Sequence, residues 1–94
     1  MQFETFLQSI SASAPPENSS VYLQSMWFDA KGDWHEAHSL VDHLHDPDAC
    51  WVHAYLHRKE GDIANADHWY RCAGKTRPSV SLEVEWEIIV KALL

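Results

Sequence analysis

The feature that most constrains the fold is a helix–turn–helix signal that occurs twice, 29 residues apart. In the segments KGDWHEA (31–37) and EGDIANA (60–66), Gly-Asp is followed by an apolar residue and, three positions after it, by alanine. Glycine is typical of the left-handed position after a helix, and aspartate is a good N-cap for the next helix. The apolar positions around both signals match at the same spacing. The repeat therefore predicts two consecutive αα-hairpins.

The rest of the chain is also predicted to be helical, because apolar residues recur three and four positions apart between clear breaks. Proline cannot continue a helix, so a first helix is expected to end before Pro15 and Pro16. Side chains that suit helix N-caps precede the later apolar stripes. These expected N-caps are Ser19 or Ser20, Asp33, Asp46, Asp62 and Ser81.

Residues 1–94 are thus expected to form one all-α domain of about six short antiparallel helices. The repeat units are placed at about 19–46 and 47–78. Capping helices are expected at about 2–13 and 81–94, since two repeats are few for such an array.

Charge and hydropathy exclude several classes of function. Fourteen acidic residues against seven basic ones give a net charge of −7, which would repel a nucleic-acid backbone. The N-terminus lacks the basic region of a signal peptide, and no apolar run reaches the length of a membrane span. Cys50 and Cys72 have no CxxC spacing and are expected to be reduced, partly buried thiols. The chain is predicted to be cytoplasmic, with no membrane partner and no cofactor.

The repeat resembles the tetratricopeptide and Sel1-like class of helical repeats. The second unit matches the tetratricopeptide pattern at six positions, whereas the first unit keeps only Gly32, Ala37 and an apolar Val41. The period of 29 is shorter than the usual ~34 residues of that class. The resemblance implies a domain that binds proteins or peptides. The six matching positions of the second unit are Ala54, Gly61, Ala66, Tyr70, Ala73 and Pro78.

The run from Trp51 to Gly74 is similar to a family of small uncharacterised bacterial proteins, whose core reads W-V-H-A-Y-L-H-R-x-E-G-D-x-x-N-A-x-Y-W-Y-R-R-A-G. This chain departs from the pattern at His68, where the family has Tyr, and at Cys72, where it has Arg. The likeness implies no particular chemistry.

A polar pocket is expected around His53 and His57, which lie four residues apart on one helix. The repeat pattern turns both imidazoles toward the partner helix, where buried ring nitrogens need hydrogen-bond partners. The leading interpretation is that both rings are packed and hydrogen-bonded. Candidate partners in this pocket are Asp62, Asn65 and Tyr70.

A metal site, or a site for a small molecule or proton transfer, is the alternative for His53 and His57. Two histidines at this spacing can hold one ion, but a third ligand would have to come from another part of the chain. The segment HEAH (35–38) lacks the histidine spacing of the HExxH zinc motif. His38 and Asp42 share a helical face that is expected to be solvated. No metal is therefore assigned from the sequence.

The opposite face of the same helix is the candidate binding surface. Trp51, Tyr55 and Arg58 are expected to line the concave side of the repeats, joined by Tyr22 and Met26 of the preceding hairpin. Aromatic and arginine side chains are enriched in recognition sites. The alternative is that Trp51 and Tyr55 only pack against neighbouring helices. If the surface binds a partner, Arg58→Glu should abolish binding without lowering the melting temperature.

The leading hypothesis is a non-enzymatic module that binds a protein or peptide through Trp51, Tyr55 and Arg58. The competing hypothesis is a small enzyme or ligand- or metal-binding protein built around His53 and His57. No catalytic residue is assigned, because no nucleophile motif or phosphate-binding loop is present. The last helix carries a second apolar stripe, which favours a homodimer through this helix. That stripe comprises Val84, Ile88 and Leu94.

Overall fold

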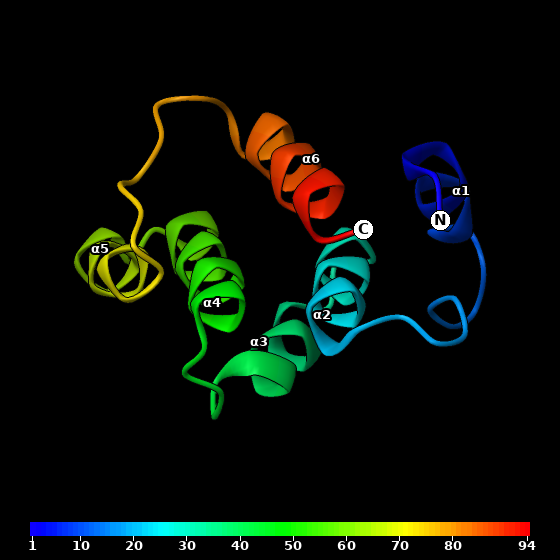
Figure 1. Ribbon diagram of the computed structural model, residues 1–94, viewed down its shortest axis with the longest axis horizontal. Coiled ribbons are helices and arrows are strands. Elements are labelled where there is room, and N and C mark those ends of the chain that lie inside the picture. The colour runs from blue at the N-terminus through cyan, green and yellow to red at the C-terminus, as the bar shows by residue number, and fades with distance from the viewer.

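The protein is described here by a computed structural model that covers residues 1–94. It has six α-helices and no strand, which confirms the all-α prediction (Figure 1). The helices are α1 (Phe3–Ser9), α2 (Val21–Ala30), α3 (Trp34–Val41), α4 (Pro47–Glu60), α5 (Ile63–Cys72) and α6 (Leu82–Leu93).

The two Gly-Asp turns have the same geometry. Gly32 and Gly61 adopt φ angles of 86° and 89°, which only glycine reaches without strain. Asp33 and Asp62 then cap the next helices, and their backbone amides donate back to the carbonyls of Phe28 and His57 at 2.9 and 3.0 Å. The repeated signal in the sequence is therefore a repeated turn in the structure.

Small side chains let the two helices of each hairpin approach closely. Ala54 of α4 and Ala66 of α5 are fully buried at their contact. In the α2–α3 hairpin, Ala37 is fully buried, and Ser25 satisfies its own hydroxyl by donating to the Ala37 carbonyl at 2.7 Å. Both hairpins thus use small residues where the helices cross.

Helix α6 packs across α2 and α4, on the side opposite α3 (Figure 1). Ile89 and Val90 of α6 are fully buried in the main core. Phe6 of α1 joins this core, with its ring centroid 6.1 Å from that of Trp86 on α6. Helices α1 and α5 lie at opposite ends of the molecule. The consequence for function is that α6 covers the face shared by α2 and α4.

None of the six helices combines the length and the apolar character that crossing a membrane requires.

Candidate functional site

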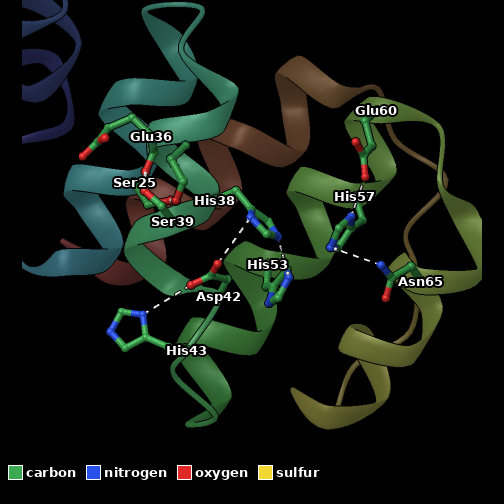
Figure 2. Close-up of polar contacts among 11 residues, drawn as sticks. Ser25, Glu36, His38, Ser39, Asp42, His43, His53, His57, Glu60 and Asn65 are labelled. Atoms are coloured by element: carbon green, nitrogen blue, oxygen red, sulfur yellow. Dashed lines mark hydrogen bonds and ion pairs between the residues drawn. The ribbon is translucent and has the colours of Figure 1, made fainter.

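Three imidazole rings from two helices meet on the α3 side of α4 (Figure 2). His53 and His57 project from successive turns of α4, with ring centroids 4.7 Å apart. His38 reaches them from α3, and its Nε2 lies 3.1 Å from Nε2 of His53. One ring nitrogen of each histidine lies within 4.8 Å of the other two. We call His38, His53 and His57 the histidine cluster.

The structure corrects the expected position of His38. The ring does not lie on a solvated polar face, because it stacks on the Trp34 indole at 4.8 Å and contacts both histidines of α4. Its Nδ1 faces Asp42 at 3.7 Å, as the shared helical face predicted. Burial, and then the nearby His57, lower the pKa of His38. The sequence could not show this contact, because it depends on how α3 crosses α4.

His53 is the most enclosed ring of the histidine cluster, with 4% of its surface exposed. It stacks on the Trp69 indole of α5 at a centroid distance of 4.1 Å. Its Nδ1 is buried and has no hydrogen-bond partner. Burial, followed by the neighbouring His57 and His38, lowers the pKa of His53 to about 4. The ring is therefore neutral at pH 7.

His57 is oriented by one neighbour at each ring nitrogen. Its Nδ1 lies 2.6 Å from Oε1 of Glu60, and its Nε2 lies 3.3 Å from the amide nitrogen of Asn65. The carboxylate can only accept, so the ring proton belongs on Nδ1 and the lone pair on Nε2. The Asn65 amide then donates to that lone pair (Figure 2).

The predicted polar pocket is only partly assembled. Asn65 contacts His57 as expected, and Asp62 lies close enough for a carboxylate oxygen to be within 4.8 Å of His57 and Glu60. Tyr70 is not part of it, because its hydroxyl donates to Oε2 of Glu85 at 2.6 Å on the other side of α4. Burial, and then this hydrogen bond, raise the pKa of Tyr70.

Arg58 from the candidate binding surface is engaged within the chain. Its guanidinium donates to Oε1 of Glu85 at 2.7 Å and to the backbone carbonyl of Val80. Glu85 lies on α6 and is 2% exposed, so it needs these donors. Arg58→Glu would set two carboxylates against each other at this point. Contrary to the expectation from sequence, this variant is therefore expected to destabilise the fold.

Tyr55 of the same surface is buried, with 2% of its surface exposed. Its hydroxyl donates to Oδ2 of the buried Asp29 at 2.9 Å, and Lys59 donates to the other carboxylate oxygen at 2.9 Å. Burial, and then the charge of Asp29, raise the pKa of Tyr55. Trp51 is half-buried, and the Lys75 ammonium lies over its ring in a cation–π contact, 4.2 Å from the ring centroid.

The two residues expected from α2 do not form a free surface either. Met26 is fully buried in the core. Tyr22 is half-buried and donates to Oδ2 of Asp46, the N-cap of α4, at 2.7 Å. Whether any of these side chains meets a partner stays a prediction.

An open apolar groove of about 330 Å³ lies among α1, α2, α4 and α6. Leu7 and Trp86 contribute to its walls, and the Tyr55–Asp29–Lys59 group lies along it. Tyr55 is the one predicted surface residue that lines this groove. Sequence reasoning missed it because α1 and α6, which supply much of it, lie outside the repeats. The complete lining is Leu7, Ile10, Asp29, Ala30, Tyr55, Lys59, Leu82, Glu83 and Trp86.

The two cysteines are free thiols in different environments. Cys50 is buried, and burial together with the neighbouring Cys72 raises the pKa of the Cys50 thiol. Cys72 is exposed, and its sulfur lies 3.9 Å from Nε2 of His68, one turn earlier on α5. The exposed Cys72 differs from the partly buried thiol expected from the sequence. Its contact with His68 follows from their spacing, because residues four apart share a face of a helix.

No model of a known protein family matches this chain, and neither do the curated proteins or the solved structures.

Proposed function

We propose that this protein is a binding module that takes a short segment of a partner protein in the groove among α1, α2, α4 and α6. The observation that carries the proposal is an open, mainly apolar groove with a few polar groups among its lining residues. Sites of this kind hold an apolar anchor and orient it through the polar groups. No catalytic constellation is included in the proposal.

The charges along the groove indicate which segment would fit. Asp29 and Glu83 line it, and Lys59 is the one basic residue among the lining side chains. Lys59 already pairs with Asp29, while Glu83 is exposed. The chain as a whole carries a net charge of −7, which favours a basic partner. The expected ligand is a peptide that pairs a large apolar side chain with an adjacent lysine or arginine.

The groove differs from the binding surface predicted from the sequence. Helix α6 already covers the face of α2 and α4, and Glu85 on α6 takes the bonds that Arg58 could have offered a ligand. Tyr55 remains at the edge of the groove. We also infer that the hairpins belong to the tetratricopeptide-like class, which the equal turns at Gly32 and Gly61 support. Many repeats of this class recognise peptides in an extended groove.

A peptide-display library provides the test. Peptides selected on the wild-type protein are made synthetically, and their affinities are measured for the wild type and for Leu7→Lys. We expect enrichment of peptides that combine an apolar anchor with lysine or arginine, and loss of their binding in Leu7→Lys. Val84→Lys is the matched control, because Val84 is as exposed as Leu7 (47% against 49%) and does not line the groove.

Two results would contradict the proposal. One is that no peptide is enriched over a display background. The other is that enriched peptides bind Leu7→Lys and Val84→Lys equally well.

A further inference from the structure

We propose that His38, His53 and His57 bind one divalent transition-metal ion, with Zn²⁺ as the representative metal. The site is separate from the groove and does not depend on it. The sequence pattern indicated only two ligands, both on α4. The structure adds a third nitrogen ligand from α3. Imidazole nitrogen is a preferred ligand of Zn²⁺ and of neighbouring ions such as Co²⁺, Ni²⁺ and Cu²⁺.

The distances suit one ion. Nitrogens bound at ~2.05 Å in a tetrahedral zinc site lie about 3.3 Å from each other. The two Nε2 atoms of His38 and His53 are 3.1 Å apart, and one nitrogen of His57 lies within 4.8 Å of both. Small changes of side-chain torsion angles would close the remaining gap. No fourth histidine, cysteine or carboxylate joins this group, so a water molecule would complete the coordination.

The protonation pattern also suits a metal. Ligating histidines usually direct the other ring nitrogen at a carboxylate or carbonyl, which fixes the tautomer. His57 does this with Glu60 at 2.6 Å, and His38 faces Asp42 at 3.7 Å. In both rings the lone pair is then left on Nε2, which lies toward the cluster (Figure 2). The two carboxylates would also balance the charge of a divalent ion.

An ion would replace a hydrogen bond between two rings of the cluster. The 3.1 Å contact between the Nε2 atoms of His38 and His53 needs a proton from one ring. Because the proton of His38 belongs on Nδ1, the shared proton comes from His53, and it would move to Nδ1 of His53 when an ion takes both Nε2 lone pairs. This Nδ1 is buried and has no hydrogen-bond partner with or without the ion, so it favours neither state. Asn65 is half-buried, so its amide can turn to water when the ion takes the lone pair of His57.

Two tryptophan side chains pack against the ligand rings, and metal centres in proteins often have such an apolar shell. The Trp34 and Trp69 indoles stack on His38 and His53 and hold these rings in place. A low-dielectric shell of this kind strengthens ligand–metal bonding. The same indoles provide a signal, since a bound paramagnetic ion such as Co²⁺ should quench their fluorescence.

The test is a calorimetric titration of the chelator-treated protein with Zn²⁺, repeated with Co²⁺ and followed by tryptophan fluorescence. We expect saturable binding of one ion per chain. The tight phase should disappear in His38→Gln and persist in His43→Gln. His43 is a matched control, because it also pairs with Asp42 but lies in solvent outside the cluster.

A second pair of variants leaves the ligands intact. Glu60→Gln removes the acceptor that orients His57 and should weaken Zn²⁺ binding about 10- to 100-fold, as for other outer-shell carboxylates. Glu87→Gln removes a surface carboxylate that pairs with Lys91 and should leave the affinity unchanged. Circular dichroism in chelator checks that each variant is folded. The proposal is overturned if no ion binds at 1:1, or if His38→Gln binds Zn²⁺ as tightly as His43→Gln.

Discussion

The carboxylate of Glu85 shows how one buried side chain can decide the role of several others. It accepts from Arg58 of α4 and from Tyr70 of α5, so three helices meet at one charge. Both donors had been assigned to candidate sites on sequence grounds. In the structure, both side chains donate hydrogen bonds to the Glu85 carboxylate, because a buried carboxylate needs compensating donors.

Arg58→Glu is expected to lower the free energy of unfolding by about 3–5 kcal/mol, because it breaks a buried ion pair and leaves the charge of Glu85 uncompensated. Urea unfolding followed by circular dichroism measures the change. Arg71→Glu on the exposed surface of α5 is the control and should change the stability little. Equal stability of the two variants would show that the Arg58–Glu85 pair contributes nothing.

Elements in this protein are delimited by local signals, and these signals are repeated. Five of the six helices have an N-cap that was expected from the sequence. These N-caps are Ser20, Asp33, Asp46, Asp62 and Ser81. The two glycines of the repeated turn have open space where a Cβ atom would lie. Any cost of replacing them should therefore come from the backbone conformation alone.

Gly61→Ala and Gly32→Ala should each lower the free energy of unfolding by about 1–2 kcal/mol, because alanine resists the left-handed conformation. The two losses should be similar, since the φ angles and the surroundings are similar. Gly61→Asn is the control and should lose less, because asparagine tolerates this region. Thermal or urea unfolding compares the three variants. A large difference between the two alanine variants would contradict the equivalence of the turns.

The molecule as a whole is held together by helices that lie outside the repeats. Phe6 of α1 and Ile89 and Val90 of α6 are fully buried in the main core formed with α2 and α4. The Trp86 indole links the two ends of the chain, since it packs on Phe6 and donates to the carbonyl of Met26 at 3.0 Å. The terminal helices are thus part of the folding unit.

Phe6→Ala should lower the free energy of unfolding by about 3–5 kcal/mol, as other large-to-small changes in protein cores do. Leu7→Ala is the control in the neighbouring position, where the side chain is exposed and the change should be small. Unfolding is followed by urea titration. Equal stability of the two variants would mean that α1 is not part of the cooperative core.

The helices, the N-caps of α2 to α6 and both turns were predictable because each depends on a few neighbouring residues. Gly61 and Asp62, for example, specify a turn whatever packs against it. The inward direction of His53 and His57 was also predictable, since the repeat assigned their face of α4 to the hairpin interior.

Tertiary packing alone decided the other contacts of α4. The position of α6 across α2 and α4 buried Tyr55 and paired Arg58 with Glu85. Nothing in the spacing of those residues encodes where α6, which begins 22 residues after the end of α4, comes to lie. The crossing of α3 over α4 likewise brought His38 to His53. Helical periodicity fixes which residues share a face, whereas the packing of distant helices fixes what that face meets.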